Sequence, residues 1–154
     1  MTTAAQHNPN AFSITANAMV LADHVITITD NLNTFPDFSR TKKKNQDGTV
    51  TEILVQREDC ITNMVRRQAV DIYLSCCKAN SIDATREPGR KEERLSEQRK
   101  AMELCKEHMI MIQLCKKHFH LNNAKVMYWG KMTRDLMIAI AKWNNSDKDR
   151  YKNI

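Results

Sequence analysis

The sequence has few residues that break helices. Its 154 residues include three glycines and three prolines, whereas an all-β fold needs turn residues about every 8–12 positions. No apolar run approaches the roughly 18 residues that a membrane-spanning helix requires. The first ten residues have neither the basic start nor the apolar centre of a signal peptide. We therefore expect a mostly helical, cytoplasmic protein.

Positive charge is missing from the first quarter of the chain. Residues 1–39 hold no Lys or Arg and three aspartates, whereas residues 40–154 hold all 24 basic residues and 15 acidic ones, so this part carries 24 − 15 = +9. A basic surface attracts polyanions, above all nucleic acid. A merely soluble, mildly basic protein is the alternative that charge alone leaves open.

Apolar residues recur at spacings of three and four in four segments, which is typical of amphipathic helices. The segments are 9–32, 51–80, 90–121 and 124–143. Residues 37–50 are polar and indicate a long, mobile, basic loop, and residues 144–154 indicate a flexible charged tail. Four long helices with modest connections predict one all-α domain over residues 1–154, an up-down-up-down four-helix bundle.

Residues for catalysis or metal binding are scarce. The three glycines are isolated, which excludes a phosphate-cradling loop, and no HExxH motif is present. Cys105 and His108, like Cys115 and His118, are three apart and could each offer two metal ligands. No CxxC accompanies either pair, so ordinary buried thiols and surface histidines are the favoured interpretation. We expect no catalytic residue, no metal and no cofactor.

Basic residues are the more informative signal. No helix-turn-helix, zinc-finger or RNA-recognition signature appears, so any nucleic-acid binding should rest on phosphate contacts and read little sequence. Whether RNA or DNA is preferred stays open. The candidate nucleic-acid-binding residues are Arg40, Lys42, Lys43, Lys44, Arg66, Arg67, Arg90, Lys91, Arg94, Lys116, Lys117, Lys125, Lys131 and Arg134.

Two stretches resemble a known family. The run over residues 121–146, in which Trp143 is followed shortly by Ser146, resembles the last helix of accessory variability determinant proteins of diversity-generating retroelements. Phe35-Pro36 followed by Arg40 resembles the turn between that family's first two helices. The resemblance covers about residues 12–146. It departs from the family at residues 141–142, where Ala-Lys replaces a frequent Gly-Gly pair.

The resemblance implies a specific function. Such proteins form a small basic barrel of five four-helix protomers, bind nucleic acid with little sequence preference and associate with the retroelement's reverse transcriptase. They support mutagenic copying of a template RNA into cDNA without catalysing it. The resemblance therefore predicts a ring-like homo-oligomer, a pentamer. Four-helix proteins encoded in intervening sequences of bacterial ribosomal RNA genes share the general pattern and stay an alternative, as does a helical protein–protein adaptor.

Overall fold

The computed structural model describes residues 11–31, 33–56 and 60–154. Its elements are the helices α2 (Ala11–Thr29), α3 (Ile61–Ser81), α4 (Lys91–Phe119) and α5 (Asn123–Arg150), the strands β1 (Phe38–Lys44) and β2 (Val50–Gln56), and a short 3-10 helix, η1 (Pro88–Arg90). No helix in these described ranges has the length and apolarity to cross a membrane.

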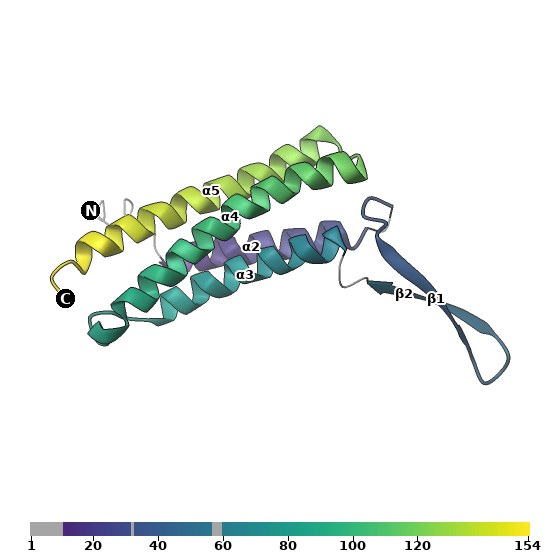
Figure 1. The fold of residues 1–154 in the computed structure, drawn as a ribbon, viewed down its shortest axis with the longest axis horizontal. Coiled ribbons are helices and arrows are strands. Elements are labelled where there is room, and N and C mark those ends of the chain that lie inside the picture. The colour runs from purple at the N-terminus through teal and green to yellow at the C-terminus, as the bar shows by residue number, and fades with distance from the viewer. Residues whose placement is uncertain (1–10, 32, 57–59) are drawn as a thin grey trace.

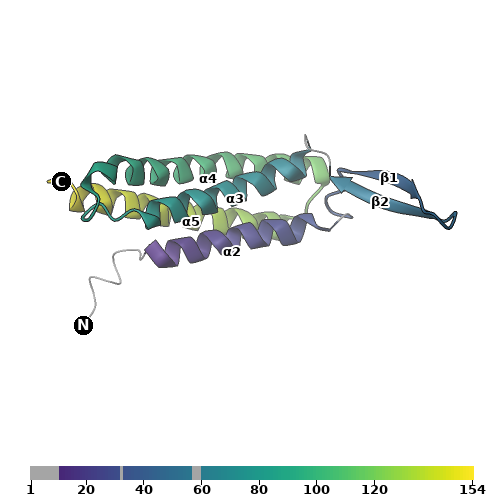
Figure 2. The same ribbon diagram turned by 90° about the horizontal axis from the view of Figure 1, so that it is seen from below.

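The four helices form an antiparallel bundle (Figure 1, Figure 2). α3 packs against α2 and α4, α5 packs against α4, and α2 closes against α5. The prediction of a mostly helical bundle is confirmed. We call the end where α2 ends, α3 begins and α4 turns into α5 the hairpin end, because β1 and β2 project from it. The opposite end is called the far end.

The core follows the predicted apolar stripes. Ile14, Leu21 and Val25 of α2 are almost fully buried, and each such side chain contributes about 1.5–3 kcal/mol when it leaves water. On α4, Cys105 and Ile112, which are two helical turns apart, are both buried. The stripes therefore identify the faces that bring the helices together.

The hairpin corrects two predictions, the mobile basic loop over 37–50 and the helix start at residue 51. β1 and β2 pair antiparallel, and α3 begins only at residue 61. At the tip, the Asn45 N–H donates to the Thr49 carbonyl at 2.8 Å, and Gly48 has a φ of 86° that L side chains rarely adopt. Both features make a tight turn, and β2 is rich in the β-branched residues that suit a strand.

The C-terminal segment corrects a third prediction. α5 was expected to end near residue 143 and to be followed by a flexible tail, but it continues to Arg150. Asn144, Asp147 and Tyr151 of this segment are buried. Their polar groups bond to neighbouring elements, so residues that a hydropathy pattern assigns to solvent lie in the interior.

The other helix ends lie within a few residues of the prediction. α4 ends at Phe119 because His120 adopts a left-handed conformation with a φ of 54°. The Asn122 side chain then accepts a hydrogen bond from the Lys125 N–H at 3.1 Å and caps α5. Residues 9, 10 and 32 of the predicted first helix lie outside the described residues.

The connection from α2 to β1 is anchored in the bundle. Phe35 is buried, with its ring centroid 5.0 Å from that of Phe119 and 6.5 Å from that of Trp129. Two residues later, the Asp37 carboxylate accepts hydrogen bonds from the Thr62 N–H, at 3.0 Å, and from the Thr62 hydroxyl. Asp37 therefore caps the N-terminus of α3, and the base of β1 is fixed on both sides.

His108 of α4 is fully buried and neutral. Its Nε2 accepts a hydrogen bond from Trp129 Nε1 at 2.9 Å, which leaves the proton on Nδ1, 3.1 Å from Gln68 Oε1. Burial lowers the pKa of His108 to about 4, because the charged imidazolium would lose its hydration. The ring thus acts as a buried hydrogen-bonding link between α3 and α5.

The free energy of unfolding should therefore fall when the pH is lowered from about 7.5 to about 5. The unfolded chain protonates His108 near its ordinary pKa of 6.5, but the folded chain only near 4, so the unfolded state binds more protons in this interval. This group alone should lower stability by about 2 kcal/mol. Urea unfolding should show a drop of this size that His108→Gln lacks. His118→Gln, exposed on the same helix, should keep the drop, and an equal drop in His108→Gln would contradict the assignment.

Candidate nucleic-acid interface

The structure divides the predicted basic residues between the two ends of the bundle and the groove between α4 and α5. Those at the hairpin end are Lys42, Lys43 and Lys44 of β1, Arg66 and Arg67 of α3, Lys116 and Lys117 of α4, and Lys125 of α5. Those at the far end are Arg90, Lys91 and Arg94. Arg40 pairs with Leu54 in the hairpin, and its side chain lies outside the described part of the structure.

The three lysines of β1 are exposed on the projecting hairpin. Lys42 lies opposite Glu52 and Lys44 opposite Val50, whereas Lys43 lies opposite Thr51. Because successive side chains of a strand point to opposite faces, Lys42 and Lys44 share one face and Lys43 lies on the other. In the described ranges, no carboxylate oxygen lies within 4 Å of any of the three ammonium groups.

A second cationic group surrounds the turn between α4 and α5. Lys116 is half-buried, and Lys117 and Lys125 are exposed. None of the three forms an ion pair with a described residue. Lys116 and Lys117 lie in the last turn of α4, where the helix dipole favours a cation. Lys125 lies in the first turn of α5, where the dipole disfavours one, so helix stability does not account for this lysine.

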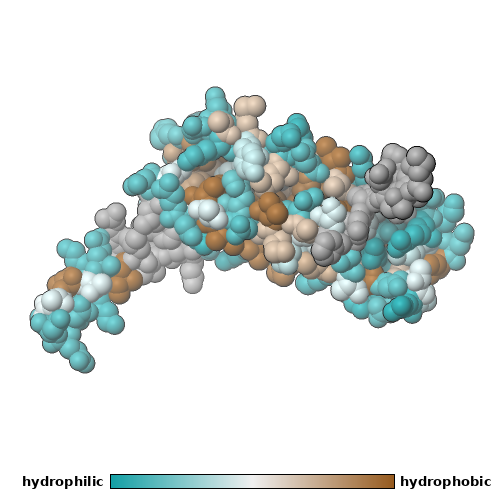
Figure 3. Space-filling view, turned by 180° about the vertical axis from the view of Figure 1, so that it is seen from behind, coloured by the Kyte–Doolittle hydropathy of each residue, from teal (hydrophilic) through white to brown (hydrophobic). Residues whose placement is uncertain are grey.

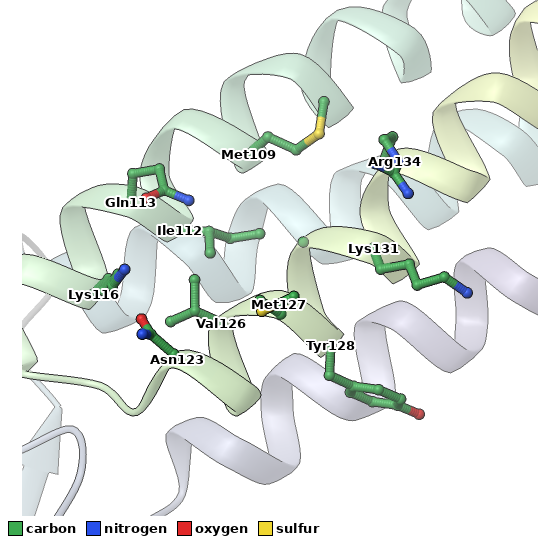
Figure 4. Close-up of a pocket in the computed structure, with 11 residues that line it drawn as sticks. Met109, Ile112, Gln113, Lys116, Asn123, Val126, Met127, Tyr128, Lys131 and Arg134 are labelled. Carbon is green, nitrogen blue, oxygen red and sulfur yellow. The ribbon is translucent and has the colours of Figure 1, made fainter.

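A groove of about 730 Å³ runs between α4 and α5 (Figure 4). Ile112 and Val126 face one another inside it, and Met127 stands at its edge, 72% exposed. Lys131 and Arg134, both predicted site residues, line it on the α5 side and lie 3.6 Å and 3.9 Å from the Asp135 carboxylate. Their charge is therefore partly balanced, and the groove is apolar with a basic rim.

The predicted basic residues at the far end have partners within the chain. Arg90 lies 3.4 Å from a carboxylate oxygen of Glu87 and 2.9 Å from one of Glu93. Lys91 donates a hydrogen bond from Nζ to the Tyr151 carbonyl at 3.0 Å. These cations bind groups of their own chain, and they are less available to phosphates than those at the hairpin end.

Arg94 corrects the predicted set, because it is buried. Its Nε donates to Asp147 Oδ2 at 2.6 Å, and its Nη1 donates to the carbonyls of Ala79 and Ile82 at 3.1 Å and 2.5 Å. Its guanidinium lies 5.2 Å from the centre of the Trp143 ring. A group enclosed in this way cannot reach a phosphate in the folded protein.

Two amides complete this buried network. Gln98 Nε2 donates to Asp147 Oδ2 at 2.6 Å, and Asn144 Nδ2 donates to Gln98 Oε1 at 2.9 Å. The network joins α4 to the part of α5 that was predicted to be a tail. The sequence analysis did not predict this network. Two spacings in the sequence hint at it. Arg94 and Gln98 lie on one face of α4, and Asn144 and Asp147 lie on one face of α5.

The cysteines of α3 and α4 fit the favoured interpretation of buried thiols, but the expectation of surface histidines is wrong for His108, which is buried. Burial raises the pKa values of Cys76, Cys105 and Cys115 to about 12, so these thiols stay protonated at neutral pH. His108, the predicted partner of Cys105, already uses both ring nitrogens. Within the described ranges, no group of three or more metal-ligating side chains comes together.

Comparison with protein-family models, curated proteins and solved structures finds no match to this chain. The resemblance described above therefore stays a prediction. The function rests on the residues themselves and on where the fold places them.

Removing Arg94 should destabilise the bundle strongly. Arg94→Met removes the buried countercharge of the Asp147 carboxylate and leaves it only the more exposed Arg150, 3.6 Å away, which should cost about 3 kcal/mol in urea unfolding. Arg94→Met combined with Asp147→Leu should cost less than the sum of the two single substitutions, because neither charge is left alone. Arg90→Gln, which removes an exposed arginine one turn earlier, should change stability little. Additive losses in the double variant would contradict a direct Arg94–Asp147 interaction.

Proposed function

We propose that this protein is a non-catalytic, basic nucleic-acid-binding accessory protein that contacts phosphates with the lysines of its hairpin end. One observation carries the proposal. The lysines of β1 and of the α4–α5 turn have no carboxylate partner among the described residues, whereas Arg90 at the far end is ion-paired. Unpaired ammonium groups gathered at one end can replace the counterions of a phosphate backbone.

Contacts of this kind predict how binding behaves. Lysines act on phosphates as flexible point charges, so binding should depend steeply on salt and only weakly on base sequence. Arg66 is less available to phosphates than these lysines, because it lies 3.4 Å from the Asp30 carboxylate. Arg67 is exposed beside it and extends the surface along α3.

The resemblance gives the proposal its cellular setting. We propose that the protein acts in the cytoplasm beside the reverse transcriptase of a diversity-generating retroelement, on template RNA or its cDNA, as a homo-oligomer and a pentamer. The apolar groove between α4 and α5 supports an interface between protomers, because Met127 and Tyr128, which line it, are 72% and 59% exposed. A monomer by light scattering, or a gene with no reverse transcriptase beside it, would contradict this part.

A helical adaptor that binds another protein is the second candidate function. The same groove favours it, since an apolar floor with the basic rim of Lys131 and Arg134 suits an acidic amphipathic helix. An adaptor needs no affinity for nucleic acid. The two candidates therefore differ in a single binding experiment.

Removing the turn lysines should weaken nucleic-acid binding. We expect Lys116→Gln/Lys117→Gln/Lys125→Gln to bind a labelled duplex about tenfold more weakly in fluorescence anisotropy, and to flatten the dependence of log Kd on log salt by about one for each lost phosphate contact. The control is Arg86→Gln/Arg90→Gln/Lys152→Gln. It removes three ion-paired cations at the far end and changes the net charge by the same amount.

The control variant should retain wild-type affinity within about twofold. Equal losses in both variants would mean that net charge alone matters, and would contradict a binding surface at the hairpin end. A wild-type protein that binds no nucleic acid at low salt would overturn the proposed function and favour the adaptor.

A further inference from the structure

The hairpin is the part of the proposed binding surface with a distinctive shape. It stands clear of the bundle as a two-stranded ribbon, and in Figure 3 its outer end is mostly hydrophilic with apolar atoms among the polar ones. Seven residues in each strand make it about 23 Å long. The bundle core does not need a ribbon of this length. We therefore consider which ligand a projecting two-stranded ribbon can bind.

We infer that this ribbon enters the major groove of double-stranded B-form DNA. The inference rests on the proposed function and names its ligand. The major groove of B-form DNA is about 12 Å wide and about 8.5 Å deep, which admits a two-stranded β-ribbon. The major groove of an A-form RNA helix is deep and narrow, and side chains cannot read it. The ribbon therefore distinguishes a DNA duplex from an RNA duplex by shape.

The three lysines of β1 are distributed over both faces of the ribbon, as binding in the major groove requires. Lys43 lies on one face of the ribbon, and Lys42 and Lys44 lie on the other. A ribbon that enters the groove edge first turns one face toward each phosphate backbone, so cations on both faces reach both walls. A flat binding surface would need lysines on one face only.

Exposed apolar side chains add a reason to enter the groove. Val50 is 61% exposed and Ile53 is 39% exposed, and neither packs against the bundle core. Both belong to β2, so when the β2 edge leads into the major groove they lie nearest the base edges and can contact the methyl group of thymine. They lie on opposite faces, since Val50 pairs with Lys44 and Ile53 pairs with Thr41.

The attachment of the ribbon suits insertion. Phe35 in the core and Asp37 on the N-terminus of α3 hold the base of β1. The lysines around the α4–α5 turn lie at the same end of the bundle, beside that base (Figure 1, Figure 2). With the ribbon in the groove, these lysines lie where they can contact the flanking phosphates.

The test compares DNA and RNA duplexes of the same sequence, each of about 20 base pairs, in fluorescence anisotropy with the full chain. We expect the DNA duplex to bind at least about tenfold more tightly than the RNA duplex. Gly48→Val keeps every charge but forces a β-branched residue into the φ of 86° at the tip. It should remove most of the DNA preference. Lys42→Gln/Lys43→Gln/Lys44→Gln should weaken DNA binding more than RNA binding.

The matched control is Gly89→Val, since Gly89 also has open space around it but no positive φ. It should keep the DNA preference, and circular dichroism should show the helical content of the wild type in all variants. Equal wild-type affinity for the two duplexes would overturn the inference and leave the proposed function standing. Absence of binding to either duplex would overturn both.

A second copy of the chain could also occupy the open edge of the ribbon by strand pairing. Light scattering on the same samples addresses this alternative. An oligomer that dissociates in Gly48→Val, together with no DNA preference in the wild type, would overturn the inference in favour of pairing between copies.

Discussion

The short junction from Phe35 to Asp37 fixes the hairpin to the bundle, and the proposed binding surface depends on this attachment. Phe35 buries its ring against Phe119 and Trp129, and Asp37 caps α3 through Thr62. A two-stranded hairpin alone is at best marginally stable in water. Because its base is held by a buried aromatic ring and a helix cap, the hairpin can project as an ordered ribbon. The lysines of β1 are thereby presented at one end of a rigid bundle.

The predicted basic residues differ in their partners between the two ends of the bundle. At the far end, Arg94 and Asp147 form a buried ion pair, and Arg90 binds carboxylates of neighbouring turns. At the hairpin end, the cations of β1 and of the α4–α5 turn lack such partners among the described residues. Exposed ion pairs contribute little to stability, so leaving lysines unpaired costs the fold little and keeps them available for a polyanion.

Much of the fold could be predicted from the sequence, because apolar spacing reports which helix face is buried. The apolar spacing in residues 9–32 predicted a helix with one buried face, and Ile14, Leu21 and Val25 are buried on that face of α2. Asn122 caps the start of α5. β2 could not be separated from a helix in the same way. Its β-branched residues become a strand only because β1 is available to pair with it.

The candidate site was predicted only in part. Lysine runs pointed to residues 42–44 and 116–117, and the structure brings both runs to the same end. Arg94 was assigned to this surface because an arginine on a charged helix is normally exposed. Its partner Asp147 lies 53 residues away in the sequence. Local spacing could place each half of the network on one helix face, but it could not reveal that the two halves meet. The same buried network explains why the expected tail is helical.

Replacing Asp37 by alanine, and measuring affinity for a DNA duplex, tests most directly the claim that an anchored ribbon carries the binding lysines. Asp37→Ala removes a negative charge, so electrostatics alone predicts tighter binding. The present account predicts weaker binding by several-fold, because the base of the ribbon loses its hold on α3. Asp30→Ala, which removes the carboxylate beside Arg66 at the same end, should not weaken binding. Binding by Asp37→Ala that equals or exceeds that of the wild type, with the helices intact by circular dichroism, would contradict the account.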